Sequence, residues 1–341
     1  MTAYSQIEER LRAAPRRWLV TGAAGFIGSN LVQRLLELDQ RVVGLDNFST
    51  GHRRNLEDVQ GCLPAARWSR FQLIEADICE SSVCRVVCGD SDVVLHQAAL
   101  GSVPRSMADP AATHQNNVTG FLTLLIAARE AGIRSFVYAS SSSVYGNDPR
   151  GVKVEHHTGA PLSPYAASKV MNELYARAFA EAYGFASIGL RYFNVFGPRQ
   201  DPEGAYAAVI PKWIAALLRH EQVQINGDGE TSRDFCFVEN VIQANLLAAT
   251  TDNPNALNQV YNIAVGERTT LHELLHLIRK QLSPAEALEP RITYAEFRSG
   301  DVRHSLADIS KARVRLGYKP THRLEAGLSA SMPWYRRMLQ S

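Results

Sequence analysis

The chain has 341 residues, of which 45% are hydrophobic and 21% charged, and its formal net charge at pH 7 is +2. This length predicts a large buried core, with one large domain and one smaller domain. The balanced charge argues against nucleic acid as a partner, and no apolar stretch approaches the roughly 20 residues of a membrane span. Because the first ten residues also lack the apolar core of a signal peptide, we expect a cytoplasmic protein without a membrane partner.

The cysteines predict no metal site and no disulfide. There are five of them, an odd number, and none forms a C-x-x-C pair: Cys62, Cys79, Cys84, Cys88 and Cys236. No histidine is spaced to complete a zinc set with them. We therefore expect reduced, structural thiols.

The N-terminal segment combines a leading piece with a glycine-rich turn. Ile7 and Leu11, at helical spacing, predict a short surface helix within residues 1–16. A strand at 18–21 then runs into Gly22, Gly25 and Gly28, which open a helix near 26–38. Glycines at such a turn let the backbone approach a pyrophosphate, which rests on the amides at the start of the helix. The segment predicts dinucleotide binding.

The second strand favours one dinucleotide over another. It covers residues 42–46 and ends in Asp46, 18 residues beyond Gly28. A carboxylate at that position accepts hydrogen bonds from the adenosine ribose and repels a 2′-phosphate, so NAD is expected rather than NADP. Arg53 and Arg54 follow, and we interpret them as solvated loop residues.

Strand and helix patterns alternate through the first half of the chain. Further strands are predicted at 71–75, 93–97, 136–140 and 187–192, and further helices near 115–131 and 165–183. This alternation predicts an α/β fold with a doubly wound parallel sheet, whose ligands lie beyond the carboxyl ends of the strands. After about residue 195, turns mixed with short apolar pieces indicate a smaller substrate domain, interleaved with late strands of the sheet.

Tyr165 and Lys169 lie four residues apart in a predicted helix, so both side chains leave one face. An ammonium group beside a phenol favours the phenolate and lowers the pKa of the phenol from its usual value near ~10. Such a tyrosine can take a proton from an alcohol. The pair alone is a short and common pattern, so its meaning depends on its neighbours.

Several motifs occur together in the order typical of one protein family: the glycine turn, Asp77-Ile78, His96 to Ala99, Asn117, the serine run 140–143, Tyr165 with Lys169, and 191–198. From residue 17 to the end, the chain resembles the extended short-chain dehydrogenases/reductases. It is most similar to nucleotide-sugar 4-epimerases, particularly bacterial UDP-N-acetylglucosamine 4-epimerases of surface-polysaccharide and O-antigen pathways. The resemblance implies a Rossmann NAD-binding domain over 1–195, with 1–16 as an extension, and a mainly nucleotide-sugar-binding domain over 196–341.

The resemblance also implies residue roles. Tyr165 is the base, Lys169 supports it, and Ser141, four positions before Tyr145, completes a triad, with Ser142 as the alternative. The positions that match NAD contacts are Gly22, Gly25, Phe26, Ile27, Gly28, Asp46, Asn47, Phe48, Ser49, Thr50, Gly51, Asp77, Ile78, Gln97, Ala98, Ala99, Asn117, Ser140, Tyr165, Lys169, Tyr192 and Val195. Those that match substrate contacts are Gly101, Ser102, Ser141, Ser142, Ser143, Asn194, Ala208, Val209, Gln224, Asn226, Arg233, Arg298, Asp301 and Ser305.

Two small residues bear on sugar selectivity. Ser305 stands where relatives that exclude acetamido sugars have a bulky tyrosine, and Ala208 is small where some relatives have asparagine. We therefore expect acceptance of a 2-acetamido group and interconversion of UDP-GlcNAc and UDP-GalNAc through a 4-keto intermediate. His96 and His304 are expected to have structural or contact roles.

Three other functions stay open. A 4,6-dehydratase or decarboxylase shares the cofactor, but dehydratases use an Asp-Glu pair where this chain has Ser142-Ser143. A uronate-sugar 4-epimerase is closer, since Arg105, Arg199 or Arg303 offers a charge for a carboxylate. A non-catalytic NAD-binding sensor or scaffold is disfavoured because both Tyr165 and Lys169 are present.

The resemblance implies a homodimer paired through helices near residues 121–128. That segment, FLTLLIAA, is apolar on more than one face and needs a partner to bury it. Burial within the same chain would satisfy the pattern equally well.

Overall fold

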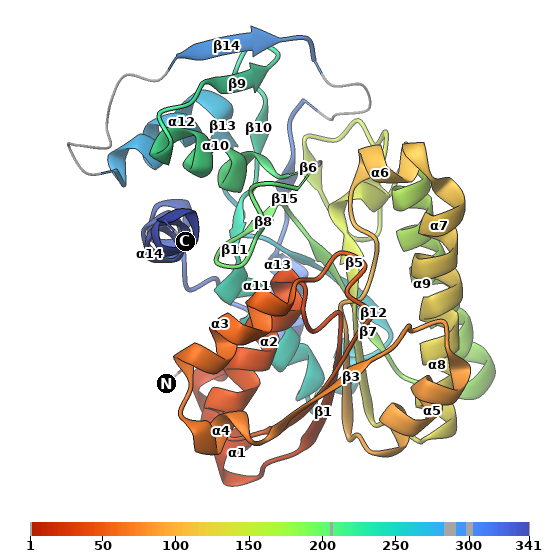
Figure 1. Ribbon diagram of the computed structural model, residues 1–341. Helices are drawn as coiled ribbons and strands as arrows, with labels where there is room; N and C mark the ends of the chain where they lie inside the picture. Colours follow the sequence, from red (N-terminus) through yellow and green to blue (C-terminus); the bar gives the residue numbers. More distant parts are fainter. Residues whose placement is uncertain (1, 205–206, 283–290, 298–302, 341) are drawn as a thin grey trace.

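The computed structural model describes residues 2–204, 207–282, 291–297 and 303–340. Seven parallel strands form the central sheet: β1 (Arg17–Thr21), β2 (Arg41–Asp46), β3 (Phe71–Glu75), β4 (Val93–His96), β5 (Ser135–Ser141), β7 (Ile188–Tyr192) and β12 (Gln259–Ile263). Their order across the sheet is β12-β7-β5-β4-β1-β2-β3 (Figure 1). This arrangement confirms the predicted doubly wound parallel sheet, and it places β12, a late strand, at one edge.

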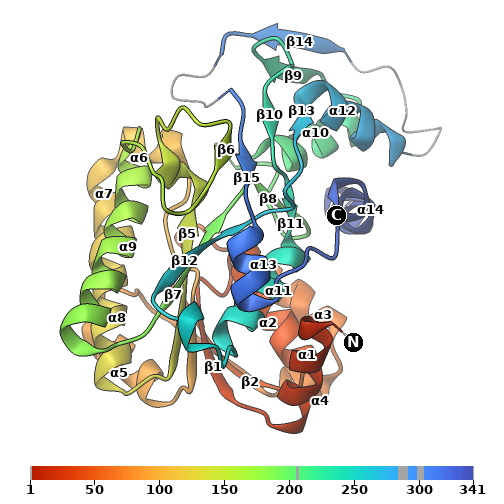
Figure 2. The ribbon, with the colours of Figure 1, turned by 180° about the vertical axis from the view of Figure 1, so that it is seen from behind.

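Helices cover both faces of the sheet (Figures 1 and 2). One face carries α5 (Ser81–Gly89), α8 (Phe121–Glu130) and α9 (Pro164–Tyr183), and the other carries α2 (Phe26–Glu37) and α11 (Val238–Ala249). Alternation along a strand serves the two layers: Trp18 and Val20 belong to the core with α2, whereas Leu19 belongs to the core with α8. Burial on both faces explains why the strands are apolar throughout.

The helix expected near 115–131 is divided in the structure. The short helices α6 (Val103–Ala108) and α7 (Pro110–His114) lead into a π-helical segment, η1 (Gln115–Gly120), before α8 begins. Pro110, at the first position of α7, interrupts the hydrogen bonding between α6 and α7. The apolar side chains of α8 are largely buried within this chain, against α5 and η1.

Five helices of the first half escaped the sequence prediction: α3 (Arg53–Cys62), the short α4 (Ala65–Trp68), α5, α6 and α7. The interpretation of Arg53 and Arg54 as loop residues is therefore wrong, because both lie in α3. Arg53 pairs with Glu75, and Arg54 lies 3.2 Å from Asp201.

Much of the part that follows β7 gathers above the carboxyl end of the sheet (Figure 2). Its helices are α10 (Val209–Leu218), α12 (Leu271–Lys280), α13 (Ser310–Leu316) and α14 (Leu324–Gln340). Short strands pair around them: β8 (Val195–Phe196) with β11 (Cys236–Phe237), β9 (Val223–Asn226) with β14 (Ile292–Ala295), β10 (Ser232–Arg233) with β13 (Thr269–Thr270), and β6 (Val152–Lys153) with β15 (Leu306–Ala307). The 3₁₀ turns are η2 (Ser142–Tyr145) and η3 (Pro254–Ala256). The domain boundary at residue 195 stays a prediction.

The leading helix α1 (Ala3–Ala13) forms as predicted, but it is more than a surface appendage. Leu11 is buried, its carbonyl accepts a hydrogen bond from the Gln40 amide at 2.8 Å, and α1 packs on α11. Across the described ranges, no helix is both long and apolar enough to cross a membrane.

Candidate active site

The glycine turn between β1 and α2 is packed too tightly for side chains. A Cβ at Gly22, where φ is +69°, would lie 2.8 Å from the Ala98 nitrogen. A Cβ at Gly28 would lie 1.9 Å from the carbonyl oxygen of Gly22. Gly25 caps the start of α2 without a side chain, so the first amides of the helix face open space that suits an anion.

Asp46, at the carboxyl end of β2, is bonded through both carboxylate oxygens. One accepts from the Ala24 nitrogen and the other from the Phe48 nitrogen, each at 2.8 Å. Burial raises the pKa of Asp46, and these two hydrogen bonds oppose the shift. A Cβ at Gly51 would lie 3.1 Å from the same carboxylate, so close packing holds Asp46 in the wall of the turn.

A cavity of about 350 Å³ follows this turn along the carboxyl edge of β1, β2 and β4. It is lined by fourteen of the residues predicted to contact NAD: Gly22, Gly25, Phe26, Ile27, Gly28, Asp46, Asn47, Ser49, Thr50, Gly51, Ile78, Gln97, Ala98 and Ala99. Sequence reasoning missed five more members, Leu45, Ala76, Leu100, Arg105 and Asn116, and assigned Gly101 to the substrate although it lies here. The shape and the glycine cradle fit a dinucleotide.

Two other residues predicted to contact the cofactor, Phe48 and Asp77, are not in the lining of this cavity. The Phe48 ring lies under the Arg53 guanidinium at 4.3 Å, outside the cavity. Asp77 accepts from the Asn47 amide at 2.7 Å and from the Cys79 nitrogen at 2.8 Å, and so supports the cavity wall. The contacts of Phe48 and Asp77 with NAD stay predictions.

A buried triangle of side chains fixes Gln97. Its amide donates to Asn245 at 3.1 Å and its oxygen accepts from the Tyr192 hydroxyl at 3.1 Å, while Asn245 donates to Tyr192 at 2.9 Å. Tyr192 therefore orients Gln97 and does not itself line the cavity. Asn245 comes from α11 and carries no motif in the sequence.

Asn117, in the π-helical segment, is buried and bonds to the Leu100 backbone on both sides. Its oxygen accepts from the Leu100 nitrogen at 2.7 Å, and its amide donates to the Leu100 oxygen at 3.1 Å and to Ser168 at 3.1 Å. Asn117 thus joins the cavity wall to α9. π-helical segments recur at functional sites, which agrees with this position.

Tyr165, Ser141 and Lys169 meet where α9 passes the carboxyl end of β5. The hydroxyl groups of Tyr165 and Ser141 are hydrogen-bonded, and Ser143 donates to Ser141 at 2.8 Å. Because Ser141 accepts from Ser143, its own proton is left to donate. The geometry favours Ser141 over Ser142 as the third member of the triad.

Lys169 lies beside Tyr165, with its ammonium 5.9 Å from the centre of the phenol ring. The ammonium donates to the Ala139 carbonyl at 2.9 Å. Burial raises the pKa of Tyr165, and the hydrogen bond with Ser141 opposes this. The expected lowering by Lys169 is thus not what the structure shows, because the cost of burying the phenolate exceeds the favourable contacts.

Ser140 differs from the other serines of the run. Its hydroxyl donates to the Glu173 carboxylate at 2.5 Å, and it lines neither this cavity nor the one described next. Its predicted contact with NAD stays a prediction.

A second cavity, of about 440 Å³, lies between α10, β9 and β10. It is lined by six residues predicted to contact substrate, Asn194, Ala208, Val209, Gln224, Asn226 and Arg233. Val195, expected beside NAD, also lies here. The remaining lining includes Arg303, which the sequence offered for a uronate, and five residues that it had not singled out: Ile210, Lys212, Trp213, Leu271 and Phe297.

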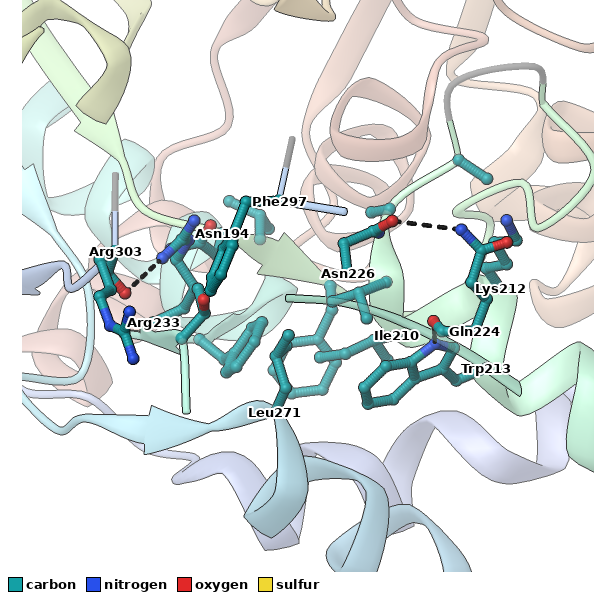
Figure 3. A pocket seen from close by; sticks show the side chains of 17 residues that line it. Asn194, Ile210, Lys212, Trp213, Gln224, Asn226, Arg233, Leu271, Phe297 and Arg303 are labelled. Carbon is teal, nitrogen blue, oxygen red and sulfur yellow. Dashed lines mark hydrogen bonds between the residues drawn. The ribbon is translucent and has the colours of Figure 1, made fainter. Parts of the chain in front are cut away.

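Figure 3 shows that the two arginines of this cavity lie apart from Gln224 and Asn226. Arg233 and Arg303 lie together at one side, where the Arg233 guanidinium donates to the Arg303 carbonyl at 3.2 Å. Gln224 and Lys212 lie at the other side, and the Gln224 amide donates to Asn226 at 3.2 Å. A guanidinium suits a diphosphate, and side-chain amides suit the edge of a base.

Several predicted substrate residues lie outside this lining. Ser102 caps α6 by accepting from the Arg105 nitrogen at 3.3 Å. Ser142 and Ser143 lie in the 3₁₀ turn that follows β5, and the Ser305 nitrogen donates to the Ser232 carbonyl at 3.1 Å. Arg298 and Asp301 lie outside the described residues.

The buried Asp234, next to Arg233, holds three segments of this half together. Its oxygens accept from the nitrogens of Val265, Gly266 and Ala307 at 3.0, 3.0 and 3.3 Å. Burial raises the pKa of Asp234 to about 6, and the three hydrogen bonds act against that rise.

The model of the NAD dependent epimerase/dehydratase family matches residues 18–264. UDP-glucose 4-epimerase from Mycolicibacterium smegmatis is 37% identical over 326 residues, which cover 95% of this chain and 100% of that protein. This chain belongs to the NAD dependent epimerase/dehydratase family.

Two solved structures of epimerases are similar over the same range. UDP-N-acetylglucosamine 4-epimerase from Methanobrevibacter ruminantium, in complex with UDP-N-acetylmuramic acid, has 39% identity and a TM-score of 0.87, covering 95% of this chain and 99% of that one. UDP-glucuronic acid 4-epimerase from Bacillus cereus, with UDP-glucuronic acid and NAD, has 31% identity and a TM-score of 0.85, covering 94% and 99%. The resemblance drawn from the motifs is confirmed, and nucleotide-sugar 4-epimerase activity with NAD is supported.

Both histidines noted in the sequence have structural partners in this epimerase fold. His96 is buried, and its Nδ1 lies 2.8 Å from the Thr21 hydroxyl, which also accepts from the Ala98 nitrogen at 3.2 Å. Burial lowers the pKa of His96 to about 3, so the ring is neutral. His304 lies with its Nδ1 2.8 Å from the Ser232 hydroxyl.

Arg199, one of the three arginines considered for a uronate, is committed elsewhere. It is buried, and it donates to Asp58 at 2.7 Å and to Asn30 at 3.2 Å, which ties the segment after β8 to α2 and α3. Its assignment to a substrate carboxylate is wrong. Arg303 lines the substrate cavity and Arg105 the cofactor cavity.

Proposed function

We propose that the protein interconverts UDP-N-acetylhexosamines, UDP-GlcNAc and UDP-GalNAc, at C4 through a transient 4-keto sugar. The observation that carries the chemistry is the hydrogen bond between Ser141 and Tyr165 beside the Lys169 ammonium. A hydroxyl pair of this kind, in a fold that also has a dinucleotide cavity and a cavity with two arginines, suits proton removal from a sugar alcohol.

The residues of the cofactor cavity have a defined task in this proposal. The amides that follow Gly25 bind the pyrophosphate, and Asp46 binds the adenosine ribose. Bound NAD supplies the acceptor and donor of hydride at C4. Since the net reaction changes no oxidation state, we expect NAD to stay bound through the cycle.

Tyr165 holds and moves the proton. It takes the proton of the 4-hydroxyl, directly or through Ser141, and returns it after the keto sugar has presented its other face. Burial raises the pKa of Tyr165. In the complete site, the positive charges of Lys169 and of oxidised nicotinamide favour the phenolate, and so they lower the free energy needed to ionise Tyr165.

The acetamido preference rests on small residues and on one relative. Ala208 lies in the lining of the substrate cavity, and Ser305 stands between two short pairings, Ser232 with His304 and β6 with β15. The Methanobrevibacter epimerase similar to this chain was solved with UDP-N-acetylmuramic acid, which also carries an N-acetyl group. Together these observations support a site with room at C2.

A uronate-sugar 4-epimerase is the second candidate. Arg303 lines the substrate cavity and would meet a carboxylate, although it also pairs with Asp228. The similar Bacillus cereus enzyme is named UDP-glucuronic acid 4-epimerase. Arg233 already serves a diphosphate in the same cavity, so we rank the uronate second.

One incubation separates these candidates. Purified protein without added NAD is given UDP-GlcNAc, UDP-GalNAc, UDP-Glc or UDP-GlcA, and the products are separated by chromatography. Our proposal predicts interconversion of the two acetamido sugars at the highest rate. Faster turnover of UDP-GlcA favours the uronate enzyme, and no turnover of any sugar favours a scaffold.

We also propose that the protein is a homodimer paired through α8 and α9. Four large hydrophobic side chains of α9 are exposed, namely Leu174 (60%), Tyr183 (58%), Met171 (39%) and Tyr175 (37%), and α9 lies against α8. A Leu174→Asp variant should elute as a monomer in size-exclusion chromatography. A dimer of unchanged stability would contradict this pairing.

A further inference from the structure

Glu173, on α9, joins three elements behind the catalytic groups. It lies one helical turn beyond Lys169, and its carboxylate accepts from the Ser140 hydroxyl at 2.5 Å. It also accepts from Arg191 through two hydrogen bonds, at 2.9 Å from Nε and at 2.7 Å from Nη2. Two parallel bonds of this kind fix both direction and distance.

The position of Ser140 gives this contact its meaning. Ser140 stands between Ala139, whose carbonyl accepts from the Lys169 ammonium, and Ser141, whose hydroxyl bonds to Tyr165. One serine held by Glu173 therefore sets the placement of both backbone neighbours against α9. A slip of β5 along α9 would disturb the Lys169 and Tyr165 contacts together.

Arg191 supplies the other anchor. It pairs in register with Ser140 across β5 and β7, it is only 3% exposed, and its Nη1 donates to the Glu155 carbonyl at 3.0 Å. Since a buried guanidinium has few alternative partners, the Glu173 carboxylate is held in place from the sheet side.

We propose that Glu173 is a positioning residue of the reaction, which clamps Ser140 and Arg191 so that Ser141 and Lys169 keep their alignment with Tyr165. This inference rests on the proposed epimerisation. The Ser140–Glu173–Arg191 contacts lie outside both ligand cavities. In this inference they affect the rate of the proton transfer.

The charges around Glu173 support the same role. Lys169 and Arg191 face it from α9 and β7, Lys311 from α13 and Tyr138 from β5. Glu173 also borders a third cavity, of about 570 Å³, with four further charged or titratable groups, Glu155, His156, Arg177 and Glu181. Burial lowers the pKa of Lys169 to about 8, and Glu173 opposes that shift, so its charge also helps to keep the ammonium.

Two variants test the clamp, with a matched control. Ser140→Ala removes one hydrogen bond and leaves the buried ion pair intact, and Glu173→Gln removes the charge at nearly constant size. Glu181→Gln, on the same helix and bordering the same cavity, is the control. If Glu173→Gln does not fold, Ser140→Ala decides.

We expect Ser140→Ala to lower kcat by roughly tenfold, with KM and bound NAD changed by less than about twofold, because alignment rather than binding is lost. Glu173→Gln should lose more, and the double variant should lose little beyond Glu173→Gln, since both act through one bond. In both variants the rise of kcat/KM with pH should move to higher pH, because Tyr165 becomes harder to ionise. The Glu181→Gln variant should match the unmodified protein.

A readout without turnover keeps this inference separate from the proposed function. Ionisation of Tyr165 is followed by ultraviolet difference absorbance against the Tyr165→Phe protein, and it should move to higher pH in Ser140→Ala. Unchanged kcat and unchanged ionisation in a folded Ser140→Ala protein overturn the clamp, as does an equal loss in Glu181→Gln. If the unmodified protein turns over no nucleotide sugar, the proposed function fails and the absorbance result alone decides the clamp.

Discussion

The Lys169 ammonium lies 5.9 Å from the centre of the Tyr165 ring. It donates a hydrogen bond to the Ala139 carbonyl of β5. We infer that the lysine supports the phenolate through its charge, because the hydrogen bond of its ammonium goes to the Ala139 carbonyl. This relationship makes the proton-handling role of Tyr165 open to separate tests of the hydroxyl and of the charge beside it.

Replacing Tyr165 by Phe removes the hydroxyl while the ring and the backbone of α9 remain. We expect turnover to fall by about 10³-fold, a typical contribution of a positioned acid or base. Bound NAD, measured by absorbance after denaturation, should be unchanged. Activity within about tenfold of the unmodified protein would remove Tyr165 from the mechanism.

The charge of Lys169 predicts how the rate falls in alkali. Burial lowers the pKa of Lys169 to about 8, so the ammonium is present below that pH and lost above it. As the ammonium is lost, the phenolate of Tyr165 loses its support and kcat should decline. Lys169→Arg, which stays charged, should be slower but should not show this alkaline decline. The same decline in Lys169→Arg would assign it to another group.

Replacing Asp46 should weaken NAD binding through a lost hydrogen bond as well as through the lost charge. Its two oxygens accept from two backbone nitrogens, and asparagine offers only one acceptor oxygen. Asp46→Asn should retain at least about tenfold less NAD after purification, because one buried N–H is left without a partner. Asp92→Asn is the control, since Asp92 bonds to the Arg17 nitrogen at the opposite end of β1. Equal NAD content in the two variants would contradict this role.

Ser305 predicts a change of selectivity without a loss of chemistry. A tyrosine at this position should abolish turnover of the acetamido sugars and spare UDP-Glc, because only the acetamido group needs the space. Ser310→Tyr, at the exposed start of α13, is the control for added bulk. Parallel losses for both kinds of sugar in Ser305→Tyr would refute the gate.

Asp234 predicts how stability depends on pH. Since burial raises its pKa to about 6, from 3.8, the folded state binds the proton more tightly than the unfolded state. Its contribution to the free energy of unfolding therefore rises as pH falls from 7 to 5, by about 1 kcal/mol. Asp234→Asn should be less stable at both pH values and lack this increment. Equal pH slopes in denaturant unfolding of the two proteins would contradict the assignment.

The sequence was sufficient for the sheet and for the edge where the ligands lie. Strand and helix periods identified β1 to β5 and β7 closely. Since a parallel sheet brings the carboxyl ends of its strands to one side, Gly22, Asp46 and Gln97 could be placed together in advance. The sequence could not predict the contacts that a single side chain makes with a distant part of the chain. Nothing local to Asn245 or Arg199 indicates its partner, because the partner comes from another element.

The direct test of the central claim follows the hydrogen at C4. UDP-GlcNAc with deuterium at C4 is converted by the purified protein without added NAD, and the product is examined by mass spectrometry and NMR. Removal of hydride by bound NAD, and its return to the other face of the same carbon, predict UDP-GalNAc that keeps the deuterium at C4. Replacement of that deuterium by solvent hydrogen, or a need for added NAD in every turnover, would contradict the account.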